Sequence, residues 1–382
     1  MEKAAIYLQN KKPRQVYREM VFENSFDAHK DFQQLRDLKC RNRAKKKDKP
    51  TATNIADEML HVLEMVKDHP FVQKVEHIKN HILSIILYGE EQMVDFQHIL
   101  KTVESPRVGI DRTFNLGSFY VTAFVYKNHR VVNTNSNDHS VFLGPVLLHK
   151  EASYKVFHDC LSHVNARLAS TIYHIDIRIP QAMEIGSDDE KALTKSIQMC
   201  FPEAKRSLCT KHLKDNVSEY LKNKISVNNS ERHNVVEKIF GNAGVLDAND
   251  TFEFEKRSDF LLSDLNMYPS FCQYYDRTLN PKLLLNIQNL AKTDRGWTNN
   301  NAESMNNILK IDTNWTPQST PDLINKISDV IKLHLIDLRR ALYGTGNYRL
   351  CSQYKKFYIK EAVFRAKCKE NRDHYFYKIF TM

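Results

Sequence analysis

Three acidic residues stand where a carboxylate could bind a cation. Asp111 follows Gly109-Ile110 in a short β-branched run, so it is either a turn residue or a ligand for a positive charge. Asp188 follows Gly186-Ser187 at the end of another such run. Glu303 lies just after the polar stretch 299–301, in what we expect to be the first turns of a helix.

These residue types predict a two-metal site. Two carboxylates a few Å apart repel, and the pKa of one of them rises unless a cation lies between them. Mg²⁺ and Mn²⁺ prefer oxygen ligands. Two such ions about 3.5–4 Å apart can activate a water and stabilise the leaving oxygen in phosphodiester cleavage. Asp189 is a rival to Asp188 as the second acid, because the two are adjacent in the sequence.

The segment that carries the first two acids has an α/β pattern. Residues 106–149 hold three β-branched and aromatic runs separated by turn signals. A helix is expected over 151–168, a strand over 181–190 to which the run 171–180 could belong, a helix up to Pro202, and a strand over 204–212. This order predicts a mixed sheet. If its first and fourth strands are neighbours, Asp111 and Asp188 lie close together.

The flanking segments have helical patterns. Residues 1–38, 51–104 and 213–290 are expected to be mainly helical, with one helix over Val72 to Leu87. A last helix should begin at Ser319-Thr320-Pro321-Asp322, where a hydroxyl cap precedes a proline and an acid.

Five motifs in order resemble Mutator-like element (MULE) transposases. They are GIDRTFNLGSFYVT, FLGPVLLH, IGSDDEKAL, LCTKHLKDN and WTNNNAESMNNILK, and they span about 100 to 315. The resemblance implies an RNase H-like α/β core that carries an Asp-Asp-Glu triad, here Asp111, Asp188 and Glu303. It also implies a helical insertion between the second and third acids, which fits the 115 positions from Asp188 to Glu303.

The resemblance also gives a domain organisation and a function. We expect a helical N-terminal region over 1–104, the core over 105–225, the insertion over 226–295, the helix of the third acid over 296–318, and a helical C-terminal region over 319–382. The implied enzyme is a DDE-type transposase that uses two Mg²⁺ or Mn²⁺ ions for DNA strand cleavage and strand transfer. It would act on double-stranded DNA in the nucleus, as a homo-oligomer.

Cys209 and His212 form a Cys-x-x-His pair directly after the last strand of the core. A zinc site would need two more ligands at a suitable spacing, and the sequence shows no partner motif, so zinc is not expected. The resemblance makes the pair part of the family's core signature, as a structural pair or as a neighbour of the active site.

Basic and aromatic residues suggest a DNA-binding track. A basic groove neutralises phosphates, and distorted bases stack on aromatic rings. The alternative for each residue taken singly is a core tryptophan or a solvated charge. The candidates are Lys205, Arg206, Lys211, Lys214, Trp297 and Lys310.

The composition of the whole chain favours a polyanionic partner. Its 382 residues carry a formal net charge of +10, although many basic proteins bind no nucleic acid. No apolar run is long enough to span a bilayer, and seven scattered cysteines favour a reducing compartment. The basic run 39–49 is a solvated linker, a nuclear localisation signal or a phosphate-contacting arm.

Three features depart from the family pattern and keep alternatives open, and one of them is Asp189 beside the second acid. Cys40 is the only cysteine among the first 100 residues, so no N-terminal zinc module for DNA ends can be built there. Arg112 stands directly beside the first acid. One alternative is a catalytically inactive, transposase-derived DNA- or chromatin-binding protein. Another is an RNase H-fold nuclease acting on RNA–DNA hybrids or single strands.

Overall fold

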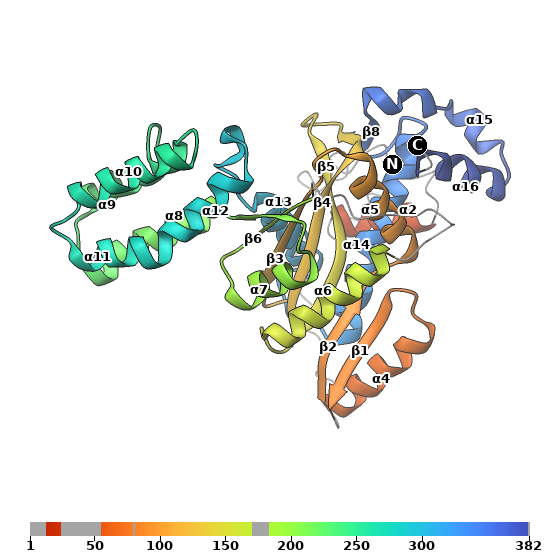
Figure 1. Cartoon of the computed structure of the whole chain (residues 1–382). Coiled ribbons are helices and arrows are strands. Elements are labelled where there is room, and N and C mark those ends of the chain that lie inside the picture. The colour runs from red at the N-terminus through yellow and green to blue at the C-terminus, as the bar shows by residue number, and fades with distance from the viewer. Residues whose placement is uncertain (1–12, 24–54, 79–80, 170–182, 381–382) are drawn as a thin grey trace.

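The computed structural model describes residues 13–23, 55–78, 81–169 and 183–380. A mixed β-sheet forms the centre of this part of the chain, with helices on both faces and a helical unit projecting from one side (Figure 1). None of the described helices combines the length and the apolar composition needed to cross a bilayer.

The sheet has eight described strands, seven of them in the order β1-β2-β5-β4-β3-β6-β7, with β8 paired to β4. Neighbours from β1 to β3 are antiparallel, whereas β3, β6 and β7 are parallel. The strands are β1 (Val72–Ile78), β2 (His81–Leu87), β3 (Arg107–Thr113), β4 (Tyr120–Asn133), β5 (His139–His149), β6 (Glu184–Ser187), β7 (Lys205–Leu208) and β8 (Tyr348–Leu350).

Both faces of the sheet are buried, because the β-branched and aromatic residues of β3 and β4 point alternately to two apolar layers. Ile110 and Phe124 face the layer of α5 (Glu90–Thr102), α6 (Tyr154–Ala169) and α7 (Lys191–Cys200). Val121 and Val125 face the layer of α4 (Ile55–Asp68), α13 (Asn300–Asp312) and α14 (Thr320–Ala341). This double cover fixes β3, which carries Asp111, at the centre of the fold.

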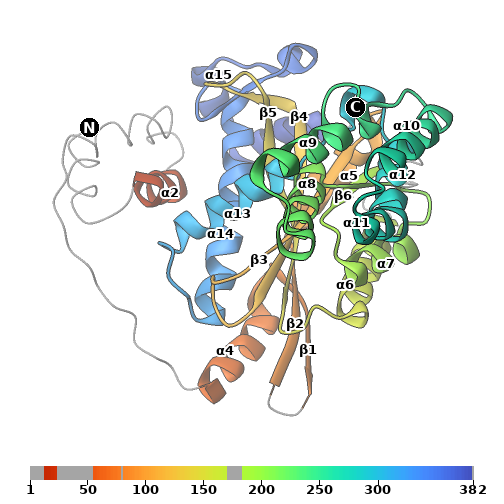
Figure 2. The same ribbon diagram turned by 90° about the vertical axis from the view of Figure 1, so that its left-hand side faces the viewer.

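A helical unit leaves the sheet after β7 and returns before α13 (Figure 2). It has an apolar core of its own, which includes Leu213, Phe254 and Leu283. The start and end of the unit are hydrogen-bonded to each other: Thr210 donates its backbone N–H to the Trp297 carbonyl (3.0 Å) and its hydroxyl to the Arg295 carbonyl (2.8 Å). The helices are α8 (Thr210–Tyr220), α9 (Asn229–Phe240), α10 (Thr251–Asp264), α11 (Pro269–Tyr274) and α12 (Asn280–Asn289).

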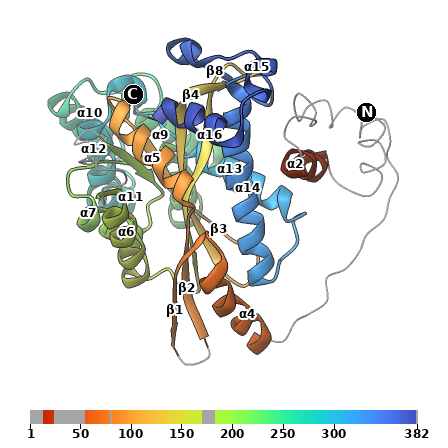
Figure 3. The ribbon, with the colours of Figure 1, turned by 90° about the vertical axis from the view of Figure 1, so that its right-hand side faces the viewer.

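The terminal segments pack on the long helix α14 and around its C-terminal end (Figure 3). In α2 (Pro13–Glu23), Tyr17 donates a hydrogen bond to the buried Asp337 of α14 (2.7 Å). The short helices α15 (Glu361–Arg365) and α16 (Lys369–Tyr377) follow β8. The start of α14 is as expected, since the Ser319 hydroxyl accepts the Asp322 N–H.

The structure corrects one expected element. Residues 72–87 form the hairpin β1–β2 rather than a helix, because Ile85 and Ile86 of β2 are buried against β5 at the sheet. The C-terminal region contains the strand β8 beside its helices. Helix α8, which begins at Thr210, packs with the helical unit. The basic run 39–49 and the expected strand residues 171–180 lie outside the described residues.

Candidate metal centre at the ends of β3 and β6

Asp111 and Asp188 are side by side because β3 and β6 are parallel neighbours. Ile110 pairs with Ser187 in the register of these strands, so the next residue on each strand is an aspartate. The first and fourth strands of the core are therefore neighbours, which is the condition under which the sequence pattern places the two aspartates close together. Asp111 is only 7% exposed, whereas Asp188 lies on the loop that follows β6.

Glu303 lines the same cavity as the two aspartates but comes from helix α13 rather than from the sheet. It lies in the first turn of α13, as expected, and the buried Ala302 and Met305 hold this helix against the sheet. Asp111, Asp188 and Glu303 together line a cavity of about 630 Å³. Three acids from distant parts of the sequence therefore share one solvent-accessible space.

The surroundings of Asp111 disfavour the charged form of its carboxyl group. Burial, and then the neighbouring charge of Asp188, raise the pKa of Asp111 to about 7. Two donors hold its oxygens: the Arg112 backbone N–H reaches Oδ1 (2.9 Å) and the Asn306 side-chain amide reaches Oδ2 (2.7 Å). Asn306 lies on α13, one turn after Glu303, so the same helix supplies the third acid and positions the first.

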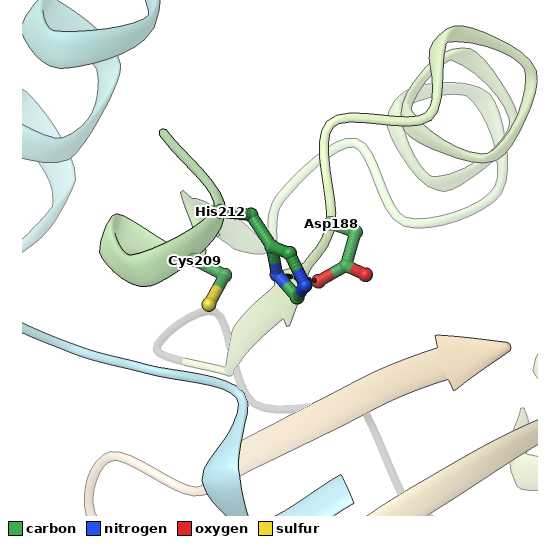
Figure 4. A group of neighbouring side chains, drawn as sticks. All are labelled: Asp188, Cys209 and His212. Carbon is green, nitrogen blue, oxygen red and sulfur yellow. Dashed lines mark ion pairs between the residues drawn. The ribbon is translucent and has the colours of Figure 1, made fainter. Parts of the chain in front are cut away.

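Asp188 is in contact with His212 (Figure 4). Their Oδ1 and Nδ1 atoms are 2.8 Å apart, although the two groups are not aligned as in a regular hydrogen bond. The interaction with Asp188, followed by that with Cys209, raises the pKa of His212 to about 10. The Cys209 thiol is buried and accepts the Asn299 backbone N–H at 3.3 Å.

Two lysines form ion pairs with acidic residues at the cavity. Lys211 contacts both oxygens of Glu303, at 3.0 and 2.9 Å. The rival second acid, Asp189, pairs with Lys282 of α12, which leaves Asp188 as the aspartate that faces Asp111.

Arg112, adjacent to the first acid, does not pair with it. Its guanidinium is directed to Glu190 (3.4 Å) and over the Tyr120 ring, and Arg112 lines the same cavity as Asp111. The alternation of side chains along β3 explains this direction, because successive residues of a strand point to opposite faces.

The residues expected to form a DNA track are dispersed. Lys205 and Arg206 lie on β7, whereas Lys214 pairs with Glu237 inside the helical unit (3.5 Å). Trp297 is half-buried and packs over Gly186 of β6, where a Cβ would lie 2.1 Å from the ring.

Two of the track residues do lie near the cavity. Lys211 contacts Glu303. Lys310 lies 5.5 Å from the ring centroid of Phe114, an exposed residue that lines the cavity, and 5.9 Å from that of the exposed Trp315. Cationic and aromatic groups therefore meet at one rim of the acidic cavity.

Sequence reasoning missed two asparagines of the site. Asn299 stands at the N-cap position of α13, but its side-chain amide donates to the Ile110 carbonyl of β3 (3.3 Å) and makes no cap bond. Asn306 was not singled out at all. Its spacing of three positions from Glu303 was the available signal, because residues three apart share a helix face.

Comparisons with known proteins leave the family open. A scan against protein-family models matched no family, and a search of curated proteins found no match. The resemblance to Mutator-like transposases therefore depends on the five motifs and stays a prediction.

Proposed function

We propose that the protein is a metal-dependent DNA-cleaving enzyme of the DDE transposase type, similar to Mutator-like transposases. The observation that carries the proposal is the meeting of Asp111, Asp188 and Glu303 at one cavity. Carboxylates on a parallel strand pair and a helix start supply the oxygen ligands that Mg²⁺ and Mn²⁺ prefer.

The topology supports an RNase H-like core. Three antiparallel strands, β5-β4-β3, continue into the parallel pair β6-β7, and the first acid lies on β3, within the sheet. A helical unit separates the second acid from the third. Both features are implied by the family resemblance.

Each acid has a distinct task in this proposal. Asp111, held by Asn306, and Asp188 would bind the cations between them, and Glu303 would complete the site from α13. Bound Mg²⁺ or Mn²⁺ would activate the attacking water or 3′-hydroxyl and stabilise the leaving oxygen. Lys211 would exchange Glu303 for a DNA phosphate when the cations bind, since it is an exposed donor at the rim.

The partner in this proposal is double-stranded DNA, engaged by a homo-oligomer in the nucleus. A net charge of +10 favours a polyanion. Work on two element ends at once calls for at least two copies of the chain.

The test is strand cleavage of labelled duplex DNA with Mg²⁺ or Mn²⁺. Wild type should nick or cut the DNA only with metal, and Asp188→Asn and Glu303→Gln should be inactive while still binding DNA. Asp264→Asn, an exposed carboxylate of the helical unit, is the matched control and should cleave normally. Cleavage of RNA–DNA hybrid alone would instead identify a nuclease of the same fold.

A second candidate is a catalytically inactive DNA- or chromatin-binding protein. It is favoured by the pairing of Glu303 with Lys211 and of Asp188 with His212, which neutralises two of the three acids without metal. Wild type, Asp188→Asn and Glu303→Gln would then bind DNA equally and all fail to cleave, even on pre-nicked ends.

A further inference from the structure

The side chains of Asp188, Cys209 and His212 converge beside the acidic cavity (Figure 4). Asp188 follows β6, Cys209 follows β7 and His212 lies in the first turn of α8, so two adjacent parallel strands bring them together. Their potential ligand atoms, a carboxylate oxygen, a thiol sulfur and an imidazole nitrogen, all lie within 4.8 Å of one another. Within the described residues, this is the one group of its kind.

We propose that these three side chains form a binding site for a soft divalent cation, Zn²⁺ in the first place. Sulfur and imidazole ligands select zinc over magnesium, whereas an all-oxygen set does the reverse. A tetrahedral zinc ion holds its ligand atoms about 3.3–3.7 Å apart, so side-chain adjustments of about 1 Å would close the site.

The contacts of the ligand atoms agree with this proposal. His212 Nδ1 and Asp188 Oδ1 face each other at 2.8 Å, are shielded from solvent, and lack a well-aligned hydrogen bond, which a cation coordinated by both would explain. Cys209 Sγ accepts a backbone N–H from Asn299, as a metal-bound sulfur can. The fourth position would be open toward the cavity, because Asp188 and His212 line it.

The cation would replace a proton on the imidazole and one on the thiol, because only the neutral imidazole and the thiolate are ligands. The competing state is the ion pair between a protonated His212 and Asp188, which needs no metal. The two states share the same atoms, so metal binding must break this ion pair.

The site has a consequence for the proposed enzyme, and this part rests on the proposed function. Asp188 would belong both to the zinc site and to the Asp-Asp-Glu centre. A zinc ion held by Cys209 and His212 would withdraw Asp188 from the magnesium ions. Micromolar zinc should then inhibit cleavage in the presence of millimolar magnesium.

Cobalt(II) binding to the full chain tests the site without reference to cleavage. We expect one equivalent of Co²⁺ to produce a sulfur-to-cobalt charge-transfer band, which Zn²⁺ abolishes and millimolar Mg²⁺ does not create. The band should vanish in Cys209→Ser. The affinity for Co²⁺ should fall more than about 100-fold in His212→Ala, because the loss of a ligand weakens metal binding more than the loss of a residue that hydrogen-bonds to a ligand.

The matched control is Cys351→Ser, because Cys351 also lies near a histidine, His139 (Sγ–Nδ1, 3.5 Å). This variant should keep the band. A band that survives Cys209→Ser, or Co²⁺ binding without any band in wild type, overturns the proposal and leaves an ion pair only. If Cys209→Ser does not fold, the test is whether wild type shows the band and whether His212→Ala weakens Co²⁺ binding. Absence of the band with cleavage intact refutes the zinc site alone, and the band without cleavage refutes the enzyme alone.

Discussion

Replacing Asp111 by asparagine should stabilise the metal-free protein above pH 7, although it removes a proposed metal ligand. Burial and Asp188 raise the pKa of Asp111 to about 7, whereas an unfolded aspartate titrates near about 3.9. Between these values the folded state holds more protons than the unfolded state. The free energy of unfolding therefore falls as the pH rises from about 4 to about 7, and the asparagine variant escapes this loss.

The magnitude follows from the contacts of the carboxylate. A difference of roughly 3 pKa units corresponds to about 4 kcal/mol. Asp111 accepts hydrogen bonds from Arg112 and from Asn306 on its two oxygens, and an amide can replace only one of these acceptors. The lost bond costs about 1–3 kcal/mol. The net gain should be about 1–3 kcal/mol at pH 8, and at pH 4 the variant should be the less stable protein.

Urea unfolding in a chelator at pH 8 and pH 4 measures this effect. Asp264→Asn, which changes a carboxylate of the helical unit, should leave the difference between the two pH values as it is in wild type. Added Mg²⁺ at 100 times its dissociation constant should stabilise wild type by about 2.7 kcal/mol and leave Asp111→Asn unchanged. If Asp111→Asn is less stable than wild type by the same amount at both pH values, the folded state does not raise the pKa of Asp111 and the prediction is wrong.

Three further substitutions test the packing of the sheet and the identity of the second acid. Gly186→Ala should lower the free energy of unfolding in urea by about 1–3 kcal/mol, because the new Cβ meets the Trp297 ring. Adding Trp297→Leu to the same chain should restore part of this loss. An unchanged urea midpoint for Gly186→Ala would mean that the ring does not cover the strand. Asp95→Ala should cost about 3–5 kcal/mol, since it removes the buried carboxylate that contacts the guanidinium of Arg130. A loss below about 1 kcal/mol would show that water reaches the guanidinium. Asp189→Asn should keep cleavage within about threefold of wild type, because Lys282 holds this carboxylate; inactivity like that of Asp188→Asn would move the second ligand by one position.

Local patterns predicted the elements that carry the acids. The strands that precede Asp111 and Asp188 were predicted from β-branched runs and turn signals. Their adjacency was one possible strand order, and the structure shows it in the pairing of β3 with β6. The first-turn position of Glu303 and the Ser319 cap were predicted for the same reason: each depends on residues within one or two helical turns.

Contacts between distant segments could not be predicted in this way. The bonds from Asn306 to Asp111 and from Lys211 to Glu303 join residues separated by 195 and 92 positions. Likewise, Val72 to Leu87 fits a helix in isolation, and only the open edge of β5 makes the hairpin β1–β2 favourable. Side-chain roles at this site are set by the packing of elements, which a single sequence does not specify.

The closed start and end of the helical unit have a consequence for how the protein folds. Glu303 can reach the two aspartates only after a segment of more than 100 residues has been brought into a loop, and a flexible loop of that length costs about 4 kcal/mol in chain entropy. A unit with its own apolar core, clamped between Thr210 and Trp297, can collapse by itself and bring the chain ends together in advance. We expect the third acid to join a preformed pair of aspartates, so that the helical unit would assist the folding of a centre to which it contributes no acid.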